Sequence, residues 1–359
     1  RDASQSKFVQ NNFDNHDVGL TLRISRNLWQ LNAGATWRPQ FTKTDYQQGK
    51  DMTEMAHFSH SYYYLAPSVD FRYNFNKQTR LRIQWRNNAS QPSVNNMIPV
   101  INNSDPLRIS GGNPELEPSY TNNISAMFNT FIASSQTSIM TNINYRNTSN
   151  SVSNMTVYNK LGGSVSMPKN IDGNWNVMGM FVFNTAFKDK RFTVGSFTNV
   201  NFNNLASYYT NQSDEKQTVR VDNFQHFLED FRNLTATKNI TKNLGLGERL
   251  NFAFRTDLFD VGINGSIQYS KVSNKLQPTA DTETYNFSYG INGNLNLPWN
   301  MSISTDLTNN SRRGYADPSF NTNELLWNVQ VAQRFLKNRA ATLTLQVYDI
   351  LRQQTNISR

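Results

Sequence analysis

Residues 261–270 read VGINGSIQYS, and residues 285–297 read YNFSYGINGNLNL. In both segments apolar or aromatic side chains alternate with asparagine, serine, glycine and glutamine. Successive side chains of a β-strand point to opposite faces of the sheet, so both segments are predicted to be strands with one apolar and one polar face. The same alternation recurs along the chain, at Val18–Ile24, Leu65–Phe75, Leu81–Trp85, Ile139–Tyr145, Trp175–Phe183, Leu250–Phe254, Met301–Leu307, Trp327–Phe335 and Ala341–Val347.

The composition bounds the class of protein. The 359 residues carry a net charge of +9, but only 17% are charged and 37% are hydrophobic. No run of ~18 apolar residues is present, which excludes a transmembrane helix. A membrane-spanning strand needs only about 9–11 residues and can hide its apolar half in alternation. A polar average composition is therefore compatible with a membrane-spanning β-barrel.

The connections between the predicted strands alternate in length. Short turns are expected near residues 26–27, 76–78, 134–135, 188–190, 259–260, 298–299 and 337–338. Longer joints are expected at roughly 47–58, 90–118, 148–170, 211–243, 274–281 and 311–321. Transmembrane barrels have short periplasmic turns and long extracellular loops, so Arg26-Asn27 is predicted to be the first periplasmic turn.

These patterns predict an all-β fold, an antiparallel up-and-down transmembrane barrel of which this chain supplies about 14 strands. A soluble β-sandwich or propeller also alternates, but it does not account for the strand lengths or for the two-sided loop pattern. We expect residues 1–359 to form one domain, a barrel truncated at both ends.

Three segments resemble TonB-dependent receptor barrels, especially those of the Bacteroidota. The first is GGNPELEPSY, residues 111–120, which resembles the G-N-P-x-L-x-P segment ahead of a strand in that family. The second is Gln84 to Asn88 with Gln91-Pro92-Ser93, which is similar to the strand exit that comes before it. The third is VYDIL at 347–351 with NISR at 356–359, which resembles the stretch ahead of the last barrel strand; Ala341–Ile350 is then the penultimate strand.

The resemblance implies a barrel of about 22 strands with an N-terminal plug, and a chain that lacks the plug, the early strands and the last strand. It implies uptake of a siderophore, cofactor, glycan or peptide, driven through the plug by the inner-membrane TonB complex. The partners would be outer-membrane lipid, the plug, the TonB complex and, in some relatives, a surface lipoprotein. A passive porin-like channel and an adhesin or assembly barrel remain alternatives.

Seven residues of these motifs are expected to have structural roles. Proline restricts the residue before it to extended conformations, so Pro114 and Pro118 stiffen the backbone at Asn113 and Glu117. The first motif is interpreted as a stiff loop that delivers the next strand in register, rather than as a ligand contact. The residues are Gly112, Asn113, Pro114, Leu116, Pro118, Tyr348 and Asp349.

Four arginines form a candidate basic strip. Arg80, Arg82 and Arg86 alternate with Leu81, Ile83 and Trp85, and Arg72 follows Asp70 on the preceding predicted strand. Charge on the lipid face costs ~2–4 kcal/mol near the midplane, so the strip is predicted to face the lumen. It would contact an anionic substrate or the plug, or it would pair with acidic side chains on neighbouring strands.

The sequence offers no catalytic centre. Cysteine is absent, and no nucleophile, metalloprotease or phosphate-loop motif occurs. His57 and His60 lie near Glu54, but no further ligand is close in sequence, so no metal site, cofactor or enzymatic activity is predicted. The excess of basic residues is spread along the chain rather than clustered, so it does not indicate nucleic-acid binding. The joints at 90–118 and 211–243 are the expected extracellular contact surface, because long loops on a rigid scaffold carry recognition.

Overall fold

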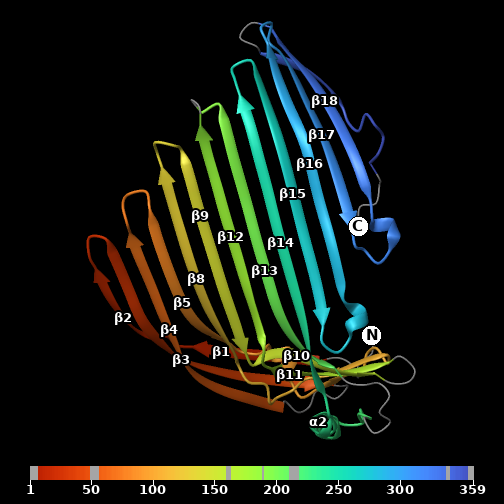
Figure 1. Cartoon of the computed structure of the whole chain (residues 1–359). Helices are drawn as coiled ribbons and strands as arrows, with labels where there is room; N and C mark the ends of the chain where they lie inside the picture. Colours follow the sequence, from red (N-terminus) through yellow and green to blue (C-terminus); the bar gives the residue numbers. More distant parts are fainter. Residues whose placement is uncertain are drawn as a thin grey trace.

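The computed structural model describes residues 7–48, 56–158, 163–187, 190–209, 218–336 and 340–354. Long antiparallel strands dominate it (Figure 1). The strands of the main sheet are β1 (Lys7–Asn15), β2 (Val18–Ser25), β3 (Trp29–Gln48), β4 (Ala56–Asn74), β5 (Arg80–Ser90), β8 (Ser119–Ile132), β9 (Thr137–Ser149), β12 (Asn174–Phe187), β13 (Phe192–Tyr209), β14 (Thr237–Arg255), β15 (Phe259–Asn274), β16 (Thr282–Leu297), β17 (Met301–Arg313), β18 (Asn323–Phe335) and β19 (Ala341–Val347).

The main sheet has 15 strands, and from β3 to β19 its strands pair in chain order. β1 and β2 both pair with β3, β1 with residues 40–48 and β2 with residues 30–37, so together they occupy one edge position. The sheet therefore has the breadth of about 14 strands that the sequence predicts. The all-β antiparallel fold is confirmed. Among the described residues the edge strands β1, β2 and β19 do not pair with one another.

The register sorts side chains onto two faces. Leu22, Ala33, Val69, Trp85, Ile124 and Tyr145 stand opposite one another across six strands. The adjacent row holds Arg23, Asn32, Asp70, Gln84, Ser125 and Asn144. Several apolar residues of the first row are well exposed, for example Leu22 at 61%. An exposed apolar face behind a polar one is the arrangement that a barrel wall needs, with lipid outside and a polar lumen inside.

The two ends of the sheet differ as the sequence predicts. One end carries the tight turns, such as residues 133–136 between β8 and β9 and residues 298–300 between β16 and β17. The other end carries the long connections, and Figure 1 shows the two ends at top and bottom. Lys188-Asp189 and Lys337-Asn338, which were among the predicted turns, lie outside the described residues.

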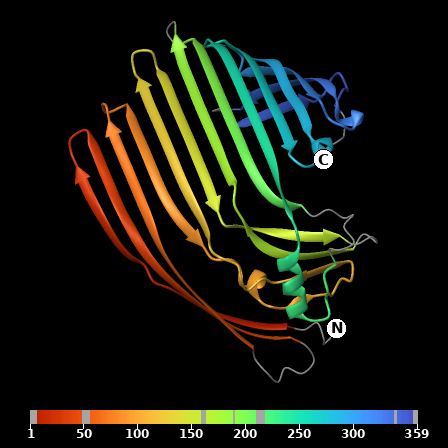
Figure 2. The same ribbon diagram turned by 60° about the horizontal axis from the view of Figure 1, so that its bottom comes forward.

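Three long connections fold together at the second end into a unit that we call the cap. Its elements are α1 (Val94–Met97), β6 (Ile101–Asn102), β7 (Arg108–Gly111), β10 (Ser151–Tyr158), β11 (Ser164–Ile171) and α2 (Phe224–Asn233). The strands form a small sheet in the order β10-β11-β7-β6, in which β11 and β7 are parallel. Figures 1 and 2 place α2 on the side of this sheet away from the main strands.

The cap has its own hydrophobic core. Met155 and Met167 point from β10 and β11 toward Phe227 and Phe231 of α2, and all four side chains are buried. The sequence analysis expected longer joints at 148–170 and 211–243, and it did not predict the strands and the helix within them. The strands β10 and β11 are short, and Pro168 lies within the second, so their alternation of apolar and polar residues is weak. The helix repeats its apolar residues with the period of an α-helix, which a search for two-residue alternation does not detect.

Two 3-10 turns shape the shorter connections at this end, Pro278–Ala280 after β15 and Pro318–Phe320 after β17. No helix in the described part of the chain has both the length and the apolar character required to cross a membrane.

One carboxylate lies on the apolar face of the main sheet. Glu248 of β14 stands between Thr198 and Ile267 in the register, with Leu246 and Leu250 on either side of it in β14. Ser196 Oγ donates a hydrogen bond to it at 2.8 Å, and Thr198 Oγ1 donates a second at 2.5 Å. The two hydroxyls supply the hydrogen bonds that lipid cannot.

Removing these hydroxyls is expected to destabilise the barrel, whereas removing the acid is not. Thr198→Val should lower the free energy of unfolding by about 1–3 kcal/mol, because the Glu248 carboxyl group loses a hydrogen-bond donor. Glu248→Leu should be neutral or stabilising, because no carboxylate then needs compensation. Urea unfolding of the full-length protein in lipid vesicles measures both effects. In the Glu248→Leu background Thr198→Val should have little further effect, and an equal loss in both backgrounds would contradict the account.

Candidate functional site

The motif at residues 111–118 fastens the cap together. Gly112 N donates a hydrogen bond to Val100 O at 3.3 Å, and Asn113 N donates to Asn96 O at 2.6 Å. The Asn113 side chain donates from Nδ2 to Pro168 O at 2.9 Å, and its Oδ1 accepts from Glu115 N at 2.9 Å. Asn113 is buried, and it joins the loop after β5 to strand β11. This one side chain links two connections that lie 55 residues apart.

The rest of the motif continues the same attachment. Glu117 N donates to Asn170 Oδ1 at 2.8 Å, and Asn170 Nδ2 donates back to Glu117 O at 2.9 Å. Leu116 is only 1% exposed, and Tyr62 Oη donates to its carbonyl at 3.3 Å. Pro118 is buried and Pro114 half-buried, directly ahead of β8. The motif therefore ties the cap to the wall of the main sheet.

Two glycines permit close approaches that a side chain would block. A Cβ atom at Gly111 would overlap the ring of Phe227, and one at Gly112 would overlap the carbonyl group of Ile98. Gly111 thus lets α2 lie against β7, and Gly112 lets α1 and its following turn lie against the motif.

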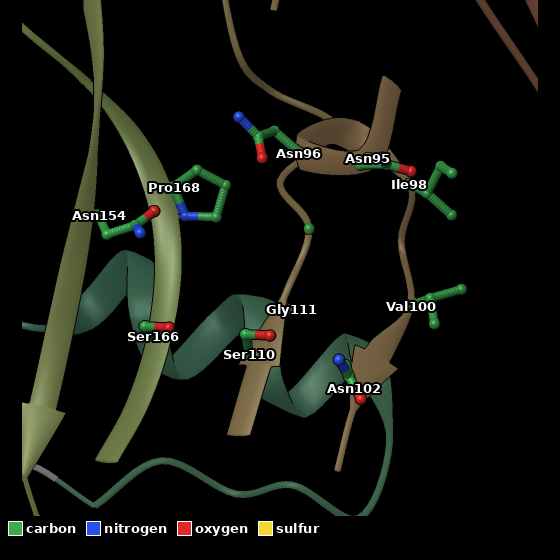
Figure 3. A pocket seen from close by; sticks show the side chains of 11 residues that line it. Asn95, Asn96, Ile98, Val100, Asn102, Ser110, Gly111, Asn154, Ser166 and Pro168 are labelled. Atoms are coloured by element: carbon green, nitrogen blue, oxygen red, sulfur yellow. The ribbon is translucent and has the colours of Figure 1, made fainter. Parts of the chain in front are cut away.

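A pocket of about 210 Å³ opens on the face of the small sheet opposite α2 (Figure 3). Ser110 and Ser166 stand side by side on β7 and β11, and Asn154 and Pro168 stand opposite each other on β10 and β11. The polar lining is Asn95, Asn96, Asn102, Ser110, Asn154 and Ser166. Because α2 covers the other face, this face of the small sheet is turned toward the main strands (Figures 1 and 2).

Five of these side chains have unused hydrogen-bonding capacity. Within the described chain no hydrogen bond reaches the side chains of Asn95, Asn96, Ser110, Asn154 and Ser166. The pocket-lining residues include no ionisable group. The pocket therefore presents neutral donors and acceptors together, with Ile98, Val100 and Pro168 as an apolar part of its wall.

The position of α2 is fixed by polar contacts at both ends. Asn223 caps the helix by accepting a hydrogen bond from His226 N at 2.8 Å. Arg220 donates to Asp230 at 2.7 Å, and the guanidinium holds the pKa of that carboxyl below its usual range. Arg232 pairs with Glu115 of the motif. The sequence signal for this helix was the apolar spacing of Phe224, Phe227, Leu228 and Phe231.

Within the described part of the chain, the basic strip divides into two arginines that bind a carboxylate, Arg72 and Arg82, and two that do not, Arg80 and Arg86. Arg72, Arg80, Arg82 and Arg86 all lie on the polar face of β4 and β5. Asp70 accepts hydrogen bonds from Arg72 at 3.1 and 3.3 Å and from Arg82 at 2.7 and 3.1 Å. Gln84 donates to the same carboxylate at 3.1 Å. By contrast, no hydrogen bond to the described chain is made by the side chains of Arg80 and Arg86, so these two cations remain open to the lumen.

Loss of Asp70 is expected to destabilise this part of the wall. Asp70→Asn removes the charge that holds Arg72 and Arg82 together, and part-buried charge-assisted bonds of this kind contribute about 1.5–3 kcal/mol. Urea unfolding of the full-length protein in lipid vesicles measures the change. Arg80→Gln and Arg86→Gln serve as matched controls and should shift stability by less than ~0.5 kcal/mol. An unchanged stability in Asp70→Asn would contradict this assignment.

Tyr348 and Asp349 lie beyond the strand in which the sequence analysis placed them. That analysis expected a strand through Ile350, but β19 ends at Val347. Asp349 has a positive φ of 46°, and its carboxylate accepts from Gln353 N at 2.9 Å and Gln354 N at 3.0 Å. This turn stays bonded to β18, because Ile350 N donates to Trp327 O at 2.9 Å, and Tyr348 is 67% exposed. Residues 356–359 of the third motif lie outside the described residues.

The histidines weighed as metal ligands have other surroundings. His57 Nδ1 lies 2.6 Å from Asp45 Oδ1, and the His60 ring packs beside Phe58 and Tyr62. Glu54 lies outside the described residues. Within the described ranges no three metal-ligating side chains come together.

Comparison with known proteins places the chain in a family. A profile of the outer membrane protein beta-barrel family matches residues 18–257, which run from β2 to just beyond β14. No curated protein matches the chain. The matched segment covers more than half of the sequence and includes both the arginine strip and the whole cap. This chain belongs to the outer membrane protein beta-barrel family, and it is a β-barrel protein of the outer membrane.

Proposed function

We propose that this barrel belongs to a TonB-dependent receptor, which takes up a scarce ligand by energised transport. The observation that carries the proposal is the cap: three connections at one end of the sheet share a hydrophobic core and present a polar pocket toward the main strands. The GNPELEP motif, on which the resemblance to such receptors rests, is the segment that holds this cap together.

A folded cap suits capture better than free diffusion. Specific binding needs donors and acceptors held in place before the ligand arrives, which a packed core and a capped helix provide. A diffusion pore needs an open, hydrated mouth instead. Capture at the cap followed by passage along a polar lumen therefore favours a receptor over a porin-like channel or an adhesin, and the long-loop end is then the extracellular end.

The barrel itself would carry out no bond chemistry and hold no cofactor. In this proposal the open cations Arg80 and Arg86 face the plug or the ligand in the lumen. The remaining partners follow from the resemblance: outer-membrane lipid around the wall, the plug within it, the inner-membrane TonB complex acting through the plug, and, as in some relatives, a surface lipoprotein over the cap.

Ion conductance separates the receptor from the passive channel. The full-length protein, purified and inserted into planar lipid bilayers, should show no steady conductance, because a plug fills the lumen. Mild urea, which loosens a plug before it unfolds a barrel, should then induce reversible channel openings. A steady conductance without urea would contradict the proposal and favour a porin-like channel.

A further inference from the structure

We infer that the cap pocket binds a neutral, polyhydroxylated ligand, so that the captured molecule is a carbohydrate. The inference rests on the proposed function, because it names the ligand class of that receptor. Its first support is the pairing chemistry. A sugar hydroxyl both donates and accepts, and so do a carboxamide group and a serine hydroxyl, which makes Asn96, Asn154 and Ser166 suitable partners.

The second support is that these partners are unoccupied. Two other asparagine side chains of the cap are used internally: Asn113 bonds Pro168 O, and Asn170 bonds the main chain at Glu117 and Asn150. The pocket-lining asparagines Asn95, Asn96 and Asn154 make no such bond with the described chain. Their amide groups are therefore available to a bound molecule.

The third support is the absence of charge among the lining residues. An anionic ligand, such as a ferric catecholate or a phosphorylated compound, calls for arginine or lysine. The pocket-lining residues offer neither, although the cap contains Arg108, Arg220 and Arg232. The apolar part of the wall at Ile98, Val100 and Pro168 fits the C–H face of a sugar ring.

Size indicates how much of the ligand enters. The pocket measures about 210 Å³. That is below the ~300–1,000 Å³ that encloses a drug-sized molecule, so the pocket would take one terminal sugar unit while the rest of the chain lies outside.

A recess in the main sheet has similar chemistry. It measures about 610 Å³ and lies on the polar face of β15, β16 and β17, beneath the turn that carries Tyr315. Its lining includes Ser266, Gln268, Ser288 and Asn310, with Arg312 and Glu324 at one side. Tyr315 Oη donates to Asn286 at 3.0 Å, which fixes an aromatic ring in this recess. Amides, hydroxyls and an aromatic ring thus recur on the polar face of the wall.

Glycan binding by the full-length protein tests the inference. The detergent-purified protein is applied to an array of neutral oligosaccharides, and affinity for any bound glycan is then measured by calorimetry. Asn96→Ala and Asn154→Ala should each weaken binding about tenfold, the effect of one lost hydrogen bond to the ligand. Asn233→Ala, an exposed asparagine at the end of α2 outside the pocket, is the matched control and should leave affinity unchanged.

Hydrogen exchange of residues 94–111 and 151–171 confirms that each variant keeps its cap. The inference is overturned if no neutral glycan binds, if binding ignores both pocket variants while the cap is intact, or if a ferric catecholate or ferric hydroxamate binds instead. Those outcomes leave the receptor proposal standing, because binding in detergent does not involve TonB. A steady open pore in the bilayer experiment would instead remove the receptor proposal itself.

Discussion

Phe227→Ala is expected to unfold the cap and to leave the barrel wall intact. The ring of Phe227 is completely buried, packs at an interplanar angle of 50° against Phe231 with a centroid distance of 4.8 Å, and lies directly over Gly111 of β7. Truncating a buried phenylalanine costs about 3–5 kcal/mol, and a small core of this kind has little stability to lose. Hydrogen exchange of the full-length protein should show loss of protection at residues 94–111, 151–171 and 224–233.

The control for this substitution lies two residues away on the same helix. Gln225→Ala changes an exposed residue of α2 and should leave exchange unaltered. Heat-modifiable migration of the folded barrel in electrophoresis reports the wall separately, and it should be normal in both variants. Loss of the folded barrel band in Phe227→Ala, or full protection of the cap, would show that the cap is not a separate cooperative unit.

Gly112→Val is expected to disorder the motif side of the cap by a different route. Any Cβ at this position overlaps the main-chain carbonyl of Ile98, which cannot move aside as a flexible side chain could. The chain must shift, so the bonds from Gly112 N to Val100 O and from Asn113 N to Asn96 O should break. Two lost hydrogen bonds and the overlap together should cost at least ~2 kcal/mol locally.

Protease sensitivity of the full-length protein measures this effect. Gly112→Val should be cleaved rapidly within residues 94–118, while unmodified protein resists. Gly265→Ala is the matched control, because a Cβ there approaches no other atom closer than 3.9 Å. Equal resistance of Gly112→Val and the unmodified protein would mean that the close approach at Ile98 is not needed for the cap.

The main sheet could be predicted from local pattern because every strand obeys one rule. Alternation of apolar and polar residues fixes the face of the sheet on which each side chain lies. Each strand pairs with the next one along the chain, so the order of the strands in the sheet follows directly from the sequence. Residues 261–270 and 285–297 therefore became neighbouring strands paired with Ile263 opposite Ile291, as their patterns require. The sequence did not predict that β1 and β2 share one edge position. The break between them at His16-Asp17 depends on how each of the two strands pairs with β3.

The cap could be predicted only in its position. Its strands are short, its parallel pair joins segments more than 50 residues apart, and its core forms only when three connections meet. Phe224, Phe227 and Phe231 carried a helical signal that was interpreted as part of a long joint. The pocket depends on Ser110 and Ser166 becoming neighbours, which no local pattern in either strand encodes.

The basic strip could be predicted less fully than the main sheet but more fully than the cap. Alternation assigned Arg72, Arg80, Arg82 and Arg86 to one face without any structural information. Only the register shows that Asp70 reaches Arg72 and Arg82, because Arg72 stands opposite Arg82 while Arg80 stands opposite Asn74. A sequence alone gives the face of a strand but not which residue of the next strand is its partner.

Direct binding to the TonB protein tests the central claim. The periplasmic domain of TonB from the same bacterium is immobilised, and the full-length purified protein is passed over it with its barrel folded. The account predicts saturable binding that survives Gly112→Val, because the cap lies at the opposite end of the barrel from the periplasmic turns. Absence of binding by a protein whose barrel is folded would contradict an energised receptor and leave a passive channel or adhesin as the function of this barrel.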